Sequence, residues 1–100
     1  MTKTKNQIVK ALNFHKCKFE KFNNSQQKPL FEFACVIGNF EIEGNIEIVD
    51  DYEVAYSVIY YDTVNDIEYD AIIGTMNNTA DETIEQKIKN LLTPKFVELK

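Results

Sequence analysis

Residues 30–73 read LFEFACVIGNFEIEGNIEIVDDYEVAYSVIYYDTVNDIEYDAII and decide the fold of this chain. Apolar residues alternate with acidic or polar ones through most of this stretch, which is the two-residue period of half-buried β-strands. Gly38 and Asn39 are typical of the tight turn in a two-residue hairpin. The stretch therefore predicts four consecutive antiparallel strands that share one apolar face and one face rich in carboxylates.

The first hairpin has one register that keeps apolar or small residues together. Its expected pairs are Ile37 with Phe40, Cys35 with Ile42, Phe33 with Gly44 and Phe31 with Ile46. A rival turn at Gly44 and Asn45 would place Ile42 opposite Glu47 and mix the two faces. We therefore expect one long strand from Phe40 to Val49.

The next two reversals are assigned in the same way. A three-residue loop over 50–52 pairs Ile48 with Val54, Ile46 with Tyr56 and Ile42 with Tyr60. A two-residue loop would set Ile48 opposite Glu53 and is rejected. A last reversal over 62–65 pairs Tyr60 with Ile67, Val58 with Tyr69, Tyr56 with Ala71 and Val54 with Ile73. All three reversals agree on one inner face, and such agreement favours the fold.

The N-terminal part predicts a helix over residues 2–13. Ile8, Ala11 and Leu12 lie on one side of it at helical spacing. After the helix, Cys17 to Phe22 fits either a continued helix or a short edge strand with lysines facing outward. We favour the strand, since edge lysines deter aggregation between sheets. Residues 23–29 form a polar loop that ends at a proline.

The C-terminal part predicts a second helix. A turn is expected at residues 76–78 after Gly74, and Thr79 with Glu82 fits a capping box. The apolar stripe of the helix consists of Ile84, Ile88, Leu91 and Leu92. Pro94 ends the helix or begins a tail, in which Phe96, Val97 and Leu99 are apolar enough to pack or to form a last strand.

These elements predict one α+β domain over residues 1–100. We expect a four- or five-stranded antiparallel meander sheet with the N- and C-terminal helices packed on one face. The apolar content of 44% is sufficient for a packed core. We expect neither a signal peptide nor a membrane-spanning helix, because the sequence shows no apolar run of the required kind. Cys17 and Cys35 are too few for a disulfide framework, so a cytoplasmic protein with free thiols is expected.

The charges are sorted along the sequence. Residues 29–86 hold fourteen acidic residues and no Lys, Arg or His, whereas residues 1–28 hold seven lysines and one glutamate. The net charge of the chain is −5. An acidic sheet repels nucleic acid, so direct DNA or RNA binding is disfavoured. Such asymmetry indicates either a choice of partner by charge or internal neutralisation of one end by the other.

The outer face of the sheet is the candidate site. One interpretation is a solvated face, as antiparallel sheets commonly have. The other is a recognition surface whose carboxylates steer a basic protein partner, with apolar anchors between them. The lack of any lysine or arginine over so long a stretch favours the second interpretation, because most surfaces mix both signs. The candidate partner-binding residues are Glu32, Glu41, Glu43, Glu47, Ile59, Tyr61, Asp66, Glu68 and Asp70.

Other chemistry is disfavoured by the sequence. Asp66, Glu68 and Asp70 alternate on one strand, but they lack the glycine and the distal bidentate glutamate of a calcium loop. His15 and Cys17 are too few for a structural zinc site and have no evident orienting acid. There is no phosphate-binding glycine loop and no nucleophile elbow. We therefore predict no enzyme activity, no metal and no cofactor.

The leading functional hypothesis is a small acidic, non-catalytic protein-binding module, monomeric or homodimeric and with no membrane partner. An inhibitor or nucleic-acid mimic from a virus or mobile element is its narrower form, which rests on composition and charge alone. The alternative is a small bacterial domain that binds a ligand or a client peptide in chaperone fashion, or that dimerises through its sheet. The fold class alone does not distinguish between these two functional hypotheses.

Overall fold

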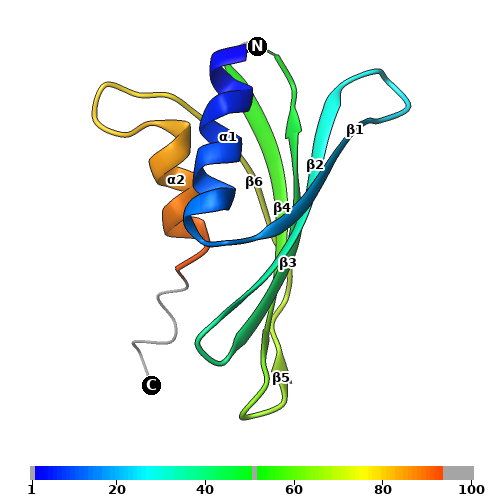
Figure 1. The fold of residues 1–100 in the computed structure, drawn as a ribbon, viewed down its shortest axis with the longest axis vertical. Coiled ribbons are helices and arrows are strands. Elements are labelled where there is room, and N and C mark those ends of the chain that lie inside the picture. The colour runs from blue at the N-terminus through cyan, green and yellow to red at the C-terminus, as the bar shows by residue number, and fades with distance from the viewer. Residues whose placement is uncertain (1, 51, 94–100) are drawn as a thin grey trace.

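The computed structural model describes residues 2–50 and 52–93 (Figure 1). The tail predicted around Phe96 lies outside the described residues. The elements follow in the order α1 (Thr2–Phe14), β1 (Lys18–Asn23), β2 (Pro29–Ile37), β3 (Phe40–Ile48), β4 (Glu53–Asp62), β5 (Ile67–Glu68), β6 (Ile72–Asn77) and α2 (Ile84–Leu91). None of the described helices is long and apolar enough to span a bilayer.

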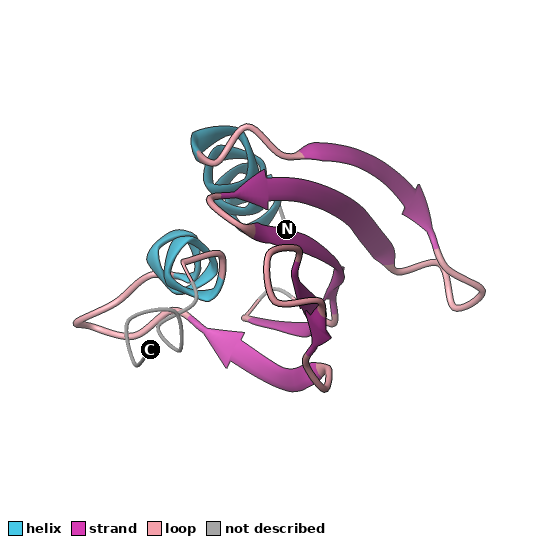
Figure 2. Cartoon of the chain, turned by 90° about the horizontal axis from the view of Figure 1, so that it is seen from below, coloured by secondary structure: helices cyan, strands magenta, loops and turns pink. Residues whose placement is uncertain are grey.

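The strands form one antiparallel sheet in the order β1-β2-β3-β4, and β5 and β6 both pair with β4. Since β3 occupies one side of β4, β5 and β6 lie one after the other along its second side. Both helices pack on the concave side of the curved sheet (Figure 2). The predicted α+β meander with two terminal helices on one face is thus confirmed.

The registers predicted for β2, β3 and β4 are confirmed. Cys35 lies opposite Ile42, and Ile42 in turn lies opposite Tyr60. The two-residue turn places Gly38 at a φ of 59°, a left-handed conformation that glycine adopts without strain. The segment that fitted either helix or strand is strand β1, and its Phe19 lies opposite the inner-face Phe33.

The register predicted for the last reversal is wrong. The sequence paired Tyr60 with Ile67, whereas Ile67 lies opposite Asp62 in the structure. The turn therefore occupies residues 63–66. The Asp62 carboxylate stabilises it by accepting hydrogen bonds from the backbone N–H groups of Val64 (3.0 Å) and Asn65 (3.1 Å).

Between β5 and β6 the pairing with β4 shifts by a further residue, across the irregular segment 69–71. Ile72 lies opposite Val58 on the inner-face side, and Ile73 lies opposite Ser57 on the outer-face side. The sequence predicted the opposite, because it placed Ile73 on the inner face opposite Val54. Strand β6 also continues through Met76, where the sequence predicted a turn.

The predicted cap of the second helix is also wrong. Helix α2 begins after Thr83, whose side chain accepts a hydrogen bond from the backbone N–H of Gln86 at 3.2 Å. Thr79 does accept from the backbone N–H of Glu82 at 3.0 Å, but this bond closes a turn that precedes the helix. Thr79 and Thr83 each begin a Thr-x-x-Glu/Gln sequence, but only the sequence that begins at Thr83 caps a helix.

The core lies between the inner face of the sheet and the two helices. Its wholly buried helix residues include Ile8, Leu12 and Ile88, and Ile42 and Val58 come from the sheet. Burying an aliphatic side chain of this size contributes about 1.5–3 kcal/mol. The predicted apolar stripes of both helices therefore face the core.

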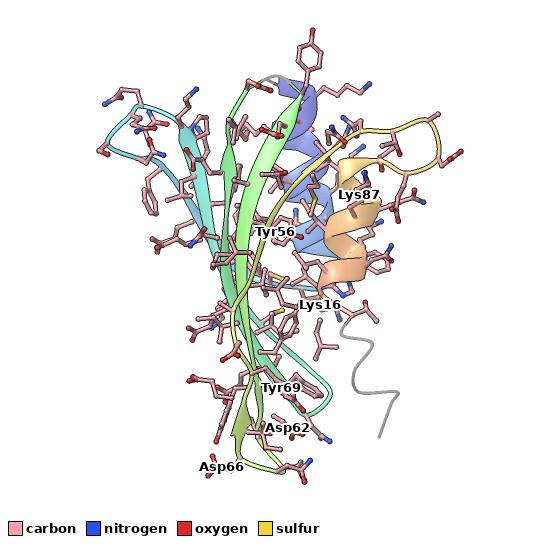
Figure 3. The ribbon with its side chains drawn as sticks, turned by 180° about the vertical axis from the view of Figure 1, so that it is seen from behind. Lys16, Tyr56, Asp62, Asp66, Tyr69 and Lys87 are labelled. Carbon is pink, nitrogen blue, oxygen red and sulfur yellow. The ribbon has the colours of Figure 1, made fainter. Side chains whose placement is uncertain are left out.

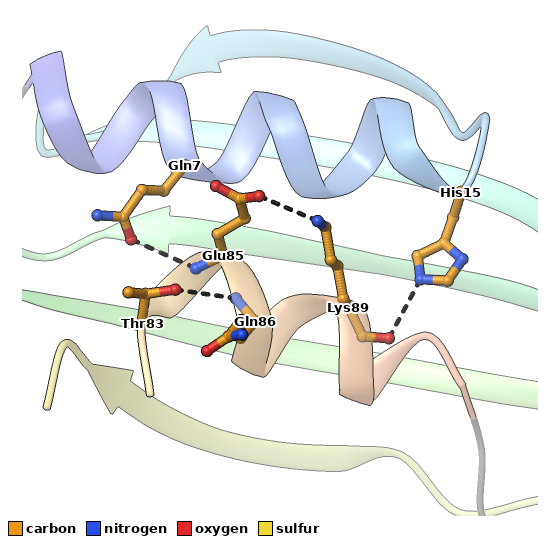
Figure 4. Close-up of polar contacts among 6 residues, drawn as sticks. All are labelled: Gln7, His15, Thr83, Glu85, Gln86 and Lys89. Carbon is orange, nitrogen blue, oxygen red and sulfur yellow. Dashed lines mark hydrogen bonds and ion pairs between the residues drawn. The ribbon is translucent and has the colours of Figure 1, made fainter. Parts of the chain in front are cut away.

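Helices α1 and α2 pack against each other (Figure 4). Gln7 Oε1 accepts a hydrogen bond from the backbone N–H of Glu85 at 3.3 Å. At the other end of α1, the His15 ring bonds the carbonyl of Lys89 at 3.1 Å. The Lys89 ammonium lies 4.3 Å from the centroid of the Phe14 ring. These contacts join the two ends of the described chain.

Candidate protein-binding face

Two adjoining hollows of about 330 Å³ and 240 Å³ run across the outer face of the sheet. Glu43 and Ile59 line both, so the hollows form one continuous shallow depression, which we call the acidic groove. The side chains that define it come from β2, β3, β4 and β5. They are Glu32, Ala34, Glu41, Glu43, Asn45, Ser57, Ile59, Tyr61 and Glu68.

The sheet register explains how so many carboxylates share this face. Glu41 lies between Val36 and Tyr61 on the neighbouring strands. Glu43 lies in the same way between Ala34 and Ile59. Since these cross-strand neighbours are uncharged, no like charges are placed directly opposite each other at the centre of the groove. The result is a ridge of carboxylates along β3, in which Glu41 and Glu43 have uncharged neighbours on both adjoining strands.

The edge of the sheet next to β1 follows a different arrangement. Here Glu20 and Glu32 lie directly opposite each other, and like charges in that position destabilise a sheet. No lysine in the described part of the chain forms an ion pair with Glu41, Glu43 or Glu68. The internal neutralisation considered from the sequence therefore does not involve direct ion pairs at the centre of the groove.

The structure brings six of the nine predicted residues together in the groove: Glu32, Glu41, Glu43, Ile59, Tyr61 and Glu68. The other three lie elsewhere. Glu47 accepts a hydrogen bond from the Asn24 side chain at 2.9 Å, so it holds the 24–28 loop. Asp70 is exposed in the irregular segment between β5 and β6. Asp66 lies in the turn that follows β4, at a φ of 55°.

Asp66 still reaches the end of the groove. The Tyr61 hydroxyl donates a hydrogen bond to its Oδ1. This bond raises the pKa of Tyr61, and burial and the negative charges of Asp66, Glu41 and Asp62 raise it further. Tyr61 therefore stays neutral and presents both a ring and a fixed hydroxyl beside the carboxylates. Figure 3 shows Asp62, Asp66 and Tyr69 gathered at this end of the sheet.

Apolar side chains flank the carboxylates. Ile59 at the centre of the face is 41% exposed, and Val36 beside Glu41 is 70% exposed. The sequence paired Ile73 with Val54 on the inner face, but the shifted register puts Ile73 on the outer face, with 76% of its surface exposed. No periodicity in the sequence could have identified Ile73, because only the irregular segment at 69–71 turns it outward.

The residues considered for a metal site or for a Cys–His site are not brought together in the described part of the chain. Among the described residues, no three His, Cys, Asp or Glu side chains lie close enough together to hold a metal ion. His15 is bonded to the Lys89 carbonyl. Its ring also contacts the edge of Phe14. Cys17 instead interacts with Cys35, and both are free thiols.

Comparisons with protein families, with curated proteins and with solved structures found no match to this chain.

Proposed function

We propose that this protein is a non-catalytic binding module whose acidic groove takes up a basic surface of another protein. The observation that carries the proposal is the composition of the groove, in which Glu41, Glu43 and Glu68 surround Ile59 and Tyr61. Folding alone gives no reason for three unneutralised carboxylates around two partly exposed large apolar side chains. Charge that steers association, together with an aromatic anchor, is typical of a binding surface.

The ridge of carboxylates indicates what the partner offers. A row of lysine or arginine side chains would lie along β3, and apolar groups on either side would contact Ile59 and Val36. An exposed ion pair contributes up to about 1 kcal/mol, so three such pairs contribute specificity and association rate more than affinity. Phosphate-like presentation of carboxylates, as an inhibitor of a DNA- or RNA-binding protein would need, is the narrower form of the proposal.

The test compares capture by the wild-type protein and by the variant E41Q/E43Q/E68Q. Each is immobilised and exposed to extract, and the captured protein is then purified and rebound. We expect the captured protein to be basic and the triple variant to bind it about tenfold more weakly, at about 0.5 kcal/mol for each lost pair. Added salt should slow association with the wild type, because salt screens exposed charges.

The matched control removes the same charge from the helix side of the molecule, as D81N/E82Q/E85Q. It should bind as the wild type does. Equal binding by the groove variant and the wild type, or association that is insensitive to salt, would contradict the proposal. If the protein mimics nucleic acid, double-stranded DNA should compete with it for the purified partner. The absence of competition would exclude the mimic and leave the general binding module.

A second candidate function, a sheet-mediated homodimer, is favoured by the character of β6. Residues 71–80 contain no charged side chain, and Ile73 on this edge strand is largely exposed. The opposite edge strand, β1, carries Lys18 and Lys21, which discourage pairing with another sheet. A second copy could add its own β6 to this edge without bringing like charges on the two strands together.

Light scattering over a range of concentrations tests the dimer. The wild type should approach twice the monomer mass, and Ile73→Lys should restore the monomer while Lys21→Ala, on the other edge, should have no effect. A wild type that stays monomeric at high concentration would exclude this candidate and leave the binding module unaffected.

A further inference from the structure

The junction between α1 and β1 places two cysteines opposite each other. After α1 the chain passes through Lys16 at a φ of 56°, and the Cys17 N–H donates to the Leu12 carbonyl at 2.9 Å. The register of β1 with β2 pairs Lys18 with Ala34. Carried one residue further, that register sets Cys17 opposite Cys35. Directly opposed residues have Cα atoms about 4.5–5.5 Å apart, which is within the range that a disulfide spans.

The two thiols differ in access. Cys17 is 8% exposed and belongs to the core, whereas Cys35 is partly exposed. Cys35 also lines a hollow of about 290 Å³, in which two lysines, Lys16 and Lys18, are matched by two glutamates, Glu41 and Glu43 (Figure 3 labels Lys16). A partly exposed thiol can meet a disulfide in solution, whereas a buried thiol cannot.

The interaction between the thiols supports the same distinction. The two thiols interact, and this interaction lowers the pKa of Cys35. The same interaction raises the pKa of Cys17, and burial adds to the effect. Cys35 therefore loses its proton first, and Cys17 stays protonated behind it. Packing as small hydrophobic groups would account for the burial of Cys17, but not for its position opposite a second, partly exposed thiol.

We propose that Cys17 and Cys35 form a redox-active dithiol, which oxidised glutathione or a similar small disulfide converts into a cross-strand disulfide. Cys35 is the attacking thiol and Cys17 is the resolving thiol. Oxidation of this dithiol does not require a partner in the acidic groove.

The reaction proceeds in two exchange steps. The Cys35 thiolate attacks one sulfur of oxidised glutathione, breaks its S–S bond and releases one glutathione thiolate, which takes up a proton. Cys17 then loses its proton to solvent and attacks the Cys35 sulfur of the mixed disulfide, releasing the second glutathione. The two protein thiols are oxidised by two electrons, and one glutathione disulfide is reduced to two thiols.

The disulfide would fasten the segment between α1 and β1 to the C-terminal end of β2. It would close the loop that contains β1 and the 24–28 turn, and so restrict the unfolded chain. For a loop of this size in a domain of 100 residues, we expect the melting temperature to rise by about 10 °C.

The first experiment uses only the wild-type protein. It is incubated with oxidised glutathione, quenched by alkylation at intervals, and examined by intact mass and by a non-reducing peptide map. We expect an early adduct on Cys35, then a product that has lost two hydrogens and carries no glutathione, with the peptides of Cys17 and Cys35 linked. A stable glutathione adduct, or thiols that stay reduced, would overturn the proposal.

The order of attack is tested with single variants. Cys17→Ser should retain one glutathione on Cys35, because no resolving thiol remains, and Cys35→Ser should react at least about tenfold more slowly. Equal rates for the two variants would overturn the assigned roles. Should either variant fail to fold, the site of the early adduct in the wild type decides the order instead.

Discussion

The two faces of β2, β3 and β4 alternate residue by residue along the same backbone, and they obey different constraints. Ile42 points into the core and is wholly buried, whereas Glu43, the next residue, is exposed in the acidic groove. The inner face is filled by side chains that the helices cover. The outer face repeats a charge that adds nothing to packing and repels itself. Stability thus accounts for one face, and the other needs a different explanation.

The largest expected contrast is between two neighbouring positions on β3. Ile42→Ala should lower the free energy of unfolding by about 2–5 kcal/mol, since it leaves a cavity in a close-packed core. Glu43→Ala should change it by no more than about 0.5 kcal/mol. Urea denaturation of both variants measures the difference. Comparable losses at the two positions would mean that the outer face is structural.

Gly44 tests how tightly the inner face is packed. A Cβ at this position would lie 2.5 Å from the Ser57 carbonyl oxygen and 2.9 Å from Phe33 Cζ. Gly44→Ala should therefore destabilise the protein by about 1–3 kcal/mol, although alanine is ordinarily the better residue in a strand.

The control for Gly44 is Phe33→Leu, combined with Gly44→Ala. It should restore only part of the loss, because the clash with the Ser57 backbone remains. Thermal melting of the single and double variants gives the comparison, and an alanine variant that is as stable as the wild type would show that the sheet relaxes at this point.

Tyr60 gives the inner face a dependence on pH. Its hydroxyl donates to the Leu91 carbonyl, and burial raises its pKa to about 12. A raised pKa means that stability is fully present below the unfolded-state pKa of about 10 and is lost as the pH rises through about 12. Tyr60→Phe should cost about 1 kcal/mol near neutral pH and should reduce this alkaline loss. Unfolding measured from pH 8 to 12 in both proteins tests this, and identical profiles would count against Tyr60.

The smallest expected effect has the opposite sign and belongs to the outer face. The variant E41Q/E43Q/E68Q should be more stable than the wild type by a few tenths of a kcal/mol up to about 1 kcal/mol at low salt, because it relieves repulsion between carboxylates. The gain should shrink at high salt. Urea denaturation at two salt concentrations provides the measurement. A loss of stability would show that the carboxylates support the fold and would remove the main argument for a binding role.

The sequence predicted the centre of the sheet correctly because two independent signals agreed there. Alternation assigned the faces of β2 and β3, and the Gly38-Asn39 turn allowed one register. The last reversal lacked that second signal. Pairing Tyr60 with Ile67 or with Tyr69 leaves every face assignment unchanged, since the two registers differ by two residues. Alternation cannot separate them, whereas the hydrogen bonds of the Asp62 carboxylate to the turn and of the Tyr69 N–H to the Tyr60 carbonyl occur with the observed register.

The candidate site was predictable in composition but not in shape. Charge and alternation located Glu41, Glu43, Ile59 and Tyr61 on one face. They could not show that Glu47 is engaged with the Asn24 loop or that irregular pairing brings Ile73 to the surface. Both depend on contacts between segments that are distant in the sequence.

The packing of α1 on α2 has a consequence for synthesis on the ribosome. Gln7 and Glu85 meet across a sequence separation of 78 residues. The helix that begins the fold therefore has to wait for the last one to emerge. At about 5–20 residues per second, the apolar face of the sheet stays only partly covered for several seconds during synthesis. A topology with so many distant contacts also predicts folding slower than that of a helical bundle of the same length.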